Sequence, residues 1–460
     1  MSIALEINDA GLILAADGEI LAETPGFALL QGQRPVTGEP AVRRARVAPL
    51  FVDNRYWLEL GTGPLARPGA AARSPADLAH AQLEDLLQPW RGSELLLAVP
   101  EWYTREQLAL LLGIVAETGC TVIGLVDAGL AAASLEPAPD HLVQFELGLH
   151  AAVLTVLEHG GSELRRVRYE MLPGHGWLAL QQAWLAQIAD AFVRRTRFDP
   201  LHEAASEQRL VDALPDVLAE VVATGTARIE LPVGTQSQSI EIDAQAIAGA
   251  VERIYDEYAN CAARARQPGA TLQLRLAHRL AALPGLEQRL AGLRDCELRR
   301  LPRGAAALGA LAHERSLRRA PGAMALVQRL PVARAGGTAE AARNAAHGRV
   351  PLAERPTHLL LDSRIHALAG RPLTLGSEVS TGRRALRIPP GPGVSRTHCT
   401  LLADAEGVWL EDHSTFGTQI NGERAGGRTE LRVGDRLRLG QPGLECLLVR
   451  AVDDDGPAQG

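Results

Sequence analysis

The chain contains no lysine, and all 47 basic side chains among its 460 residues are arginines. Lysine supplies the amine of Schiff-base enzymes and the phosphate-binding side chain of P-loop NTPases and protein kinases. The sequence therefore excludes these three classes of active site.

Cysteines are also scarce. Five occur, far apart and without a C-x-x-C pair, at Cys120, Cys261, Cys296, Cys399 and Cys446. An odd, scattered set is not typical of a disulfide framework, and it fits a reducing compartment. We therefore expect a cytoplasmic protein with no metal or other cofactor.

Long apolar runs and an excess of positive charge are absent as well. The stretch MSIALEINDAG lacks the basic segment of a signal peptide, and no window reaches about 18 consecutive apolar residues. The net charge is −7, which does not favour binding to nucleic acid. We expect neither a membrane span nor a nucleic-acid partner.

The length of the chain predicts two or three domains, because a single core rarely serves so many residues. Strand and helix patterns alternate over residues 1–316, which is typical of an α/β domain. Residues 317–355 are rich in Ala, Gly, Pro and Arg and are interpreted as a linker. Residues 356–452 have an all-β pattern, and we expect the acidic residues 453–460 to be disordered.

Periodicity predicts individual elements within the α/β segment. The predicted elements are a buried strand at Leu95–Val99, a helix at Arg105–Thr118, a hairpin at Arg228–Ile242 and one long helix at Ala244–Ala265.

Short polar motifs separate the predicted C-terminal strands. They are V-S-R-T-H at 394–398, S-T-F-G-T at 414–418, N-G at 421–422 and V-G-D-R-L-R-L-G at 433–440. In this order and spacing they resemble the forkhead-associated (FHA) domain, a β-sandwich that recognises phosphothreonine peptides. The resemblance implies a recognition module rather than an enzyme.

The resemblance assigns phosphate binding to the first two motifs. Ser395 is expected to donate to phosphate oxygens, Arg396 to add a second contact and Thr415 to shape the site. Charge-assisted donors of this kind suit a doubly charged phosphate. The residues that hold the loops in shape are Gly376, His398, Gly417 and Asn421.

Two positions depart from the FHA pattern. Phe416 replaces an asparagine that binds the peptide backbone, and Ser377 replaces an arginine that binds the phosphopeptide. Arg383 and Arg384, in a longer loop, are candidates to reach back to the phosphate. Two alternatives stay open, namely phosphothreonine binding and a docking surface that does not require phosphate.

The order of elements in residues 1–316 resembles the actin/Hsp70-like ATPase fold, which has two ribonuclease-H-like halves. The clearest match is LLLAVPEWYTREQLALLLGIVAETGCTVIGLVDAGLAAASL, in which a strand ending in V-P leads to a helix, a strand and a second helix. The stretch HLVQFELGLHAAVLTVLEHGG falls where this family has its second phosphate-binding hairpin.

The three nucleotide-binding elements implied by this resemblance are altered together. Phosphate-binding hairpins need glycines so that backbone N–H groups can approach the phosphates. Both hairpins of this chain lack the glycine-threonine run, and Ala277-His278 replaces the glycine pair of the adenosine turn. The residues of this degenerate site are Glu6, Asn8, Asp9, Glu146, Gly148 and His150.

Together these features predict a non-enzymatic adaptor with no catalytic residues. Its FHA domain would dock a protein partner, which carries a phosphothreonine if binding requires phosphate. Its Hsp70-like domain would have lost ATPase activity and would bind a second protein, such as an Hsp70-like relative. One alternative is an active Hsp70-like ATPase recruited by the FHA domain, with Glu6, Asp9, Glu146 and His150 as a remodelled metal–nucleotide site. Another is a structural part of a larger assembly.

Overall fold

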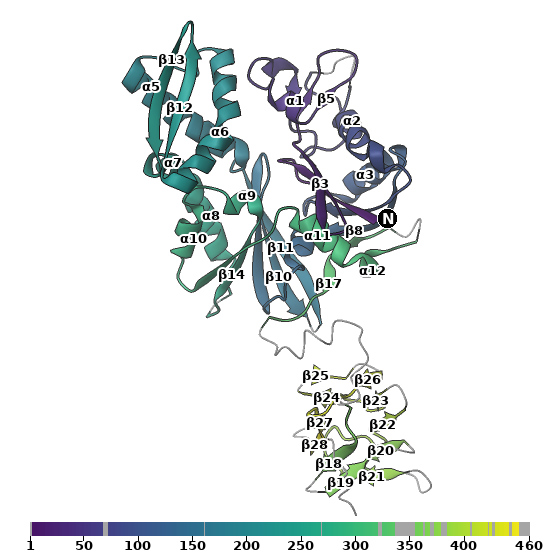
Figure 1. Cartoon of the computed structure of the whole chain (residues 1–460). Helices are drawn as coiled ribbons and strands as arrows, with labels where there is room; N and C mark the ends of the chain where they lie inside the picture. The colour runs from purple at the N-terminus through teal and green to yellow at the C-terminus, as the bar shows by residue number, and fades with distance from the viewer. Residues whose placement is uncertain are drawn as a thin grey trace, which may run out of the picture. The chain divides into compact units, whose positions relative to one another are not determined.

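The chain forms two units, Met1–Ala345 and Ala346–Gly460, in a computed structural model (Figure 1). The residues that the structure describes are 2–67, 72–160, 162–267, 269–320, 324–335, 355–361, 364–368, 372–378, 384–404, 407–421, 423–425, 428–440 and 444–449.

Apolar strands build the first six-stranded sheet of the N-terminal unit, in the order β16-β8-β7-β1-β2-β3. The first three strands in sequence form an antiparallel meander, and β7 and β8 then run parallel to β1. The strands are β1 (Ser2–Glu6), β2 (Leu12–Ala16), β3 (Glu19–Thr24), β7 (Glu94–Val99), β8 (Thr121–Asp127) and β16 (Leu326–Val327).

A second six-stranded sheet has the order β15-β14-β9-β10-β11-β17. Here too an antiparallel meander of three strands is followed by two parallel strands, β14 and β15. The strands are β9 (His141–Leu147), β10 (Ala151–Gly160), β11 (Glu163–Pro173), β14 (Leu272–Leu276), β15 (Cys296–Arg300) and β17 (Arg329–Pro331). Five strands of each half therefore follow one topology, whereas the sixth strand lies at the parallel edge of the first sheet, as β16 beside β8, and at the antiparallel edge of the second, as β17 beside β11. The predicted α/β class is confirmed.

Two alanine-rich helices join these halves. Helices α4 (Ala128–Ala133) and α11 (Ala305–Ala312) share one apolar cluster with Leu96 of the first sheet and Leu142 of the second. Small side chains let the two helices pack closely, and Figure 1 shows α11 between the two sheets. The two sheets thus have a common core, which fixes the ends of their strands relative to one another.

Other helices cover the outer face of the first sheet. Helix α3 (Arg105–Glu117) begins with a capping box, in which Thr104 and Gln107 satisfy each other's backbone N–H groups. This agrees closely with the predicted helix. The remaining elements of this half are β4 (Ala28–Leu29), β5 (Val36–Thr37), α1 (Glu39–Val42), η1 (Pro49–Phe51), β6 (Val52–Asp53), α2 (Pro75–Leu87), η2 (Gln88–Trp90) and α12 (Glu314–Leu317).

The second half carries a helical layer with a separate hairpin, β12 (Thr226–Val233) and β13 (Gln236–Asp243), as predicted. The predicted long helix is divided into α7 (Ala244–Ala250) and α8 (Glu252–Arg264), because the buried Val251 leaves helical geometry with φ −113° and ψ 9°. The other helices are α5 (Trp177–Thr196), α6 (Ala204–Thr224), α9 (His278–Ala281) and α10 (Leu286–Ala291).

The predicted linker is corrected at its N-terminal end. Residues 326–327 pair with β8, and residues 329–331 pair with β11, so both segments are edge strands of the two sheets. Strands of two and three residues are too short to produce a periodic signal in the sequence. The N-terminal unit therefore extends past residue 316.

The C-terminal unit is all-β, as predicted. Its two sheets have the orders β19-β18-β28-β27-β24-β25 and β21-β20-β22-β23-β26, and their alternate apolar residues share one core. The strands are β18 (His358–Leu361), β19 (Arg364–Ala367), β20 (Leu373–Gly376), β21 (Ala385–Arg387), β22 (Cys399–Ala403), β23 (Val408–Asp412), β24 (Thr418–Ile420), β25 (Glu423–Arg424), β26 (Arg428–Glu430), β27 (Arg436–Leu439) and β28 (Leu444–Val449).

Within the described residues, no helix has the length and apolar character needed to span a membrane. In the same part of the chain, no group of three or more His, Cys, Asp or Glu side chains is arranged to hold a metal ion.

The two units should fold independently, because the apolar clusters of the first comprise residues 3–332 and that of the second comprises residues 359–448. We expect residues 1–335 and 355–460, produced separately, to unfold cooperatively with melting temperatures within about 4 °C of the corresponding transitions in the whole chain. Circular dichroism would measure this. A fragment without a cooperative transition would contradict the division.

Candidate functional site

Two loops of the C-terminal unit meet at Ser395. The Ser395 N–H donates to Nδ1 of His398 at 3.1 Å, and its Oγ accepts from the N–H of Thr415 at 3.2 Å. Burial lowers the pKa of His398, which favours the neutral ring that can accept this bond. His398 thus fixes the backbone of Ser395, and the bond from Thr415 joins the two loops.

Asp412 organises the second loop. Its Oδ1 accepts from the N–H and Oγ of Ser414, and its two carboxylate oxygens accept from the side chain and N–H of Thr418. Burial alone would raise the pKa of Asp412, but these hydrogen bonds outweigh it and lower the pKa below its usual value. The sequence analysis did not identify Asp412, although its position two residues before the S-T pair was a usable signal.

Two glycines permit the loop geometry. A Cβ at Gly376 would lie 2.0 Å from the carbonyl oxygen of Arg396, so only glycine allows the two loops to come this close. Gly417 has φ +90°, a conformation that other residues rarely adopt. Both positions support the predicted loop-forming roles.

The predicted arginines lie in different places. Arg396 is exposed beside Ser395, with its Nε 3.7 Å from the Glu378 carboxylate. Arg384 lies at the start of β21, where its carbonyl accepts from Thr374 and its guanidinium donates to the Ala367 carbonyl. The structure therefore does not bring Arg384 to the loop of Ser395. Arg383 lies outside the described residues.

Asn421 lies at the far end of β24 from Gly417. Its side chain donates to Asp435 at 2.7 Å and accepts from the N–H of Arg436 at 2.9 Å. It therefore fixes the turn after β24 to the start of β27.

Comparison with known families identifies this arrangement of loops on a β-sandwich. Residues 373–440 match the family model of the FHA domain. They form an FHA domain. Members of this family bind phosphothreonine-containing protein partners. No curated protein matches the chain, and the predicted resemblance of residues 1–316 to Hsp70-like ATPases is not shown by the family comparison.

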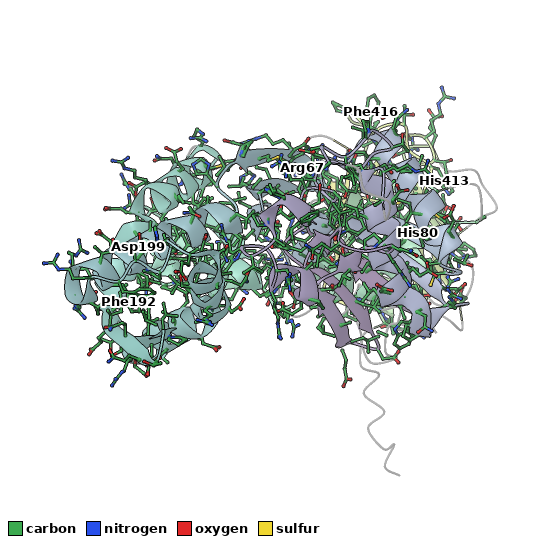
Figure 2. All side chains as sticks on the ribbon, turned by 90° about the horizontal axis from the view of Figure 1, so that it is seen from above. Arg67, His80, Phe192, Asp199, His413 and Phe416 are labelled. Atoms are coloured by element: carbon green, nitrogen blue, oxygen red, sulfur yellow. The ribbon has the colours of Figure 1, made fainter. Side chains whose placement is uncertain are left out.

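The FHA domain presents Phe416 to solvent beside this site. The side chain is 73% exposed, the highest value among the large exposed apolar residues that the structure describes, and it is labelled in Figure 2. It lies between Thr415 and Gly417, so it borders the predicted phosphate position. A phenyl ring can pack on an apolar side chain of a ligand, but it cannot form the hydrogen bonds of an asparagine.

A second candidate site lies in the N-terminal unit, where the turn after β1 meets the turn after β9. Asn8 donates from Nδ2 to the Leu147 carbonyl at 3.2 Å, and Asp9 Oδ1 accepts from the N–H of Leu149 at 2.6 Å. Gly148 continues the second turn and accepts from the N–H of Trp177. The two turns are thus joined by direct hydrogen bonds.

Arg279, at the start of α9, lies among three carboxylates. Its guanidinium is 2.9 Å from Glu23, 3.5 Å from Glu6 and 3.8 Å from Glu146, and it also donates to the Gly11 carbonyl. The sequence analysis did not identify Arg279, although it directly follows the altered Ala277-His278 pair. Glu6 and Glu146 come from the two equivalent strands β1 and β9, so Arg279 links both halves.

His150 completes the set of predicted nucleotide-site residues. Its Nε2 lies 2.9 Å from the carbonyl oxygen of Asn54, and its Nδ1 lies 3.4 Å from Nη1 of Arg55. It therefore adds a contact between the second turn and the segment before α2. The structure brings all six predicted residues together, and each has a partner from the chain itself.

The space left between these groups is small. A cavity of about 20 Å³ is lined by Glu6, Asn8, Glu101, Trp102, Gln144, Glu146 and neighbouring residues. A single water molecule requires at least about 10–15 Å³. This cavity therefore has room for a water molecule, and a separate pocket of about 420 Å³ is lined by Ala10, Asn54, Leu149 and neighbouring residues.

Burial gives this cluster unusual protonation behaviour. It raises the pKa of Glu146 to about 8, with Arg279 opposing the shift and Glu6 adding to it. Burial also raises the pKa of Glu6, whereas Arg279 and Arg303 together outweigh burial and lower the pKa of Glu23. Glu23 is therefore the ionised partner of Arg279, and Glu146 holds its proton near neutral pH.

Stability should therefore depend on pH through Glu146. Because its pKa is raised from 4.5 to about 8 in the folded state, its contribution to stability is complete below pH 4.5 and is lost as the pH rises through about 8. We expect Glu146→Gln to melt about 2 °C or more above the wild type at pH 8.5, with a smaller difference at pH 5. Differential scanning calorimetry would measure both.

Glu23→Gln is the matched control for this effect. Because the pKa of Glu23 is lowered, its carboxylate stabilises the folded state at every pH above its ordinary pKa. Removing this carboxylate should therefore lower the melting temperature at both pH 5 and pH 8.5. If Glu146→Gln and the wild type lose stability in parallel between these two pH values, Glu146 is already ionised in the folded protein.

Proposed function

We propose that the protein is a cytoplasmic, non-enzymatic adaptor whose FHA domain docks a threonine-phosphorylated protein partner. The observation that carries the first half of this proposal is the loop junction in which Ser395 and Thr415 are hydrogen-bonded beside Arg396. A serine hydroxyl that accepts from a backbone N–H still has its own hydrogen to donate to a phosphate oxygen. An exposed arginine beside it supplies the positive charge.

For the N-terminal unit we propose a degenerate actin/Hsp70-like domain that serves as a scaffold. Support comes from the five strands of each sheet that share one topology, a three-stranded meander followed by two parallel strands, as expected of ribonuclease-H-like halves. The turns at the equivalent ends of β1 and β9 are hydrogen-bonded to each other, and Arg279 joins the carboxylates there. Side chains of the chain thus take the place that this family gives to nucleotide and metal.

The alternative is an active Hsp70-like ATPase recruited to its partners by the FHA domain. Such an enzyme needs backbone N–H groups free to bind phosphate, and the Leu149 N–H already donates to Asp9. It also needs space between the carboxylates that would hold the metal, and the cavity lined by Glu6, Asn8 and Glu146 measures about 20 Å³. Both observations favour the adaptor, with an Hsp70-like relative as a possible class of partner for this unit.

We expect no ATP hydrolysis and no binding of Mg-ATP at micromolar concentration. The reason is that binding would require the Asp9–Leu149 hydrogen bond and the contacts of Arg279 with Glu6 and Glu146 to break. Isothermal titration calorimetry on the whole chain would measure binding, and phosphate release would measure turnover. Saturable binding with a micromolar dissociation constant would contradict the adaptor and support the ATPase.

Binding of phosphothreonine peptides should depend on Ser395 and Arg396. Each charge-assisted hydrogen bond typically contributes about 1.5–3 kcal/mol, so Ser395→Ala together with Arg396→Ala should weaken binding by more than a hundredfold. The sandwich should stay folded, because Arg396 is exposed and Ser395→Ala removes a single loop hydrogen bond, the one that its Oγ accepts from the Thr415 N–H. Fluorescence anisotropy with phosphorylated and unphosphorylated peptide mixtures would test this.

Phe416→Asn provides a matched variant in the same loop. It should strengthen phosphopeptide binding, because asparagine can bind a peptide backbone and phenylalanine cannot. If a captured partner binds equally well after phosphatase treatment and after the double substitution, the FHA domain is a docking surface that does not require phosphate.

A further inference from the structure

Arg387 lies at the position where the FHA resemblance lacks an arginine. Strand β21 runs parallel to β20, and Arg387 pairs in register with Gly376, immediately before Ser377. The N–H of Ile388 donates to the Gly376 carbonyl at 3.0 Å, which fixes this register. The neighbouring strand therefore places an arginine at the end of β20. This residue, Arg387, lies ten positions after Ser377 in the sequence.

The side chain of Arg387 is held toward the Ser395 loop. Its Nε donates to the Ser377 carbonyl at 3.0 Å, and the Ser377 N–H donates to the Ser395 carbonyl at 3.2 Å. A guanidinium has five N–H donors, and this bond uses the single N–H on Nε. Neither Nη has a partner among the described residues, and the side chain is exposed.

A carboxylate already occupies the neighbourhood of the other arginine. Glu378 and Arg396 are both exposed, and the Glu378 Oε2 lies 3.7 Å from the Arg396 Nε. Exposed pairs of this kind contribute little stability, so a phosphate with nearly two negative charges can displace Glu378 from Arg396. Arg387 and Arg396 then provide two positive charges, one bonded to Ser377 and one adjacent in the chain to Ser395.

We propose that Arg387 is the phosphate-binding arginine of this FHA domain, acting from strand β21 in place of the residue that follows Gly376. The bound group is the phosphate dianion of phosphothreonine, held by Arg387, Ser395 and Arg396, and Glu378 disfavours ligands with further negative charge at this edge of the site. This inference rests on the proposed phosphothreonine recognition.

The test uses the whole chain and a fluorescent peptide library with a fixed phosphothreonine between randomised positions. Arg387→Ala should weaken binding of the phosphorylated library by about ten- to a hundredfold, with the weak binding of the unphosphorylated library unchanged. Arg387→Lys should recover only part of the loss, since lysine cannot bind phosphate through two N–H groups at once. Glu378→Gln should strengthen binding.

Arg384→Ala is the matched control, because Arg384 lies on the same segment but donates to Ala367. It should change affinity less than twofold. The assignment would be overturned if Arg384→Ala lost binding while Arg387→Ala kept it. It would also be overturned if Arg387→Ala weakened binding of both libraries equally, or if the Arg387→Ala variant had a different melting temperature from the wild type. Absence of any preference of the wild type for the phosphorylated library would instead contradict the proposed function.

Discussion

The organisation of the N-terminal unit depends on one guanidinium, that of Arg279, among the carboxylates of Glu6, Glu23 and Glu146. Removing a charge from water is costly unless partners compensate it, and a single positive charge cannot compensate three negative ones. The raised pKa of Glu146 is the chemical result. Because these side chains come from both halves of a duplicated fold, the same interaction fixes the halves and fills the space between their turns.

The FHA domain relies on a different principle, because its site is built mainly from hydrogen bonds between neighbouring loops. Asp412 shapes the loop of Thr415, and His398 shapes the loop of Ser395. Groups that must bind a phosphate gain most when they are oriented before the ligand arrives. The structured loops and exposed arginines therefore suit the proposed function, in which rigid donors would surround the phosphate of the partner.

Sequence patterns predicted the features that depend on neighbours in the chain. The FHA motifs, the hairpin of β12 and β13 and the capped helix α3 are of this kind. Arg279 was missed because two of its partners lie 256 and 268 residues away. Which arginine lies beside Gly376 depends on the register of β21 against β20. Two parallel strands are joined by a connecting segment and not by a tight turn, so the sequence between them does not fix this register.

The direct contact between the turns after β1 and β9 also affects how the lifetime of a complex of this protein would be controlled. Molecular machines built on two hinged lobes measure time with a bound nucleotide, whose hydrolysis ends one state and starts the next. In the adaptor that we propose, the two turns are bonded directly to each other and provide no such clock. How long a complex of this protein lasts would then be set at the other unit, by the kinase that adds a phosphate to the partner and the phosphatase that removes it.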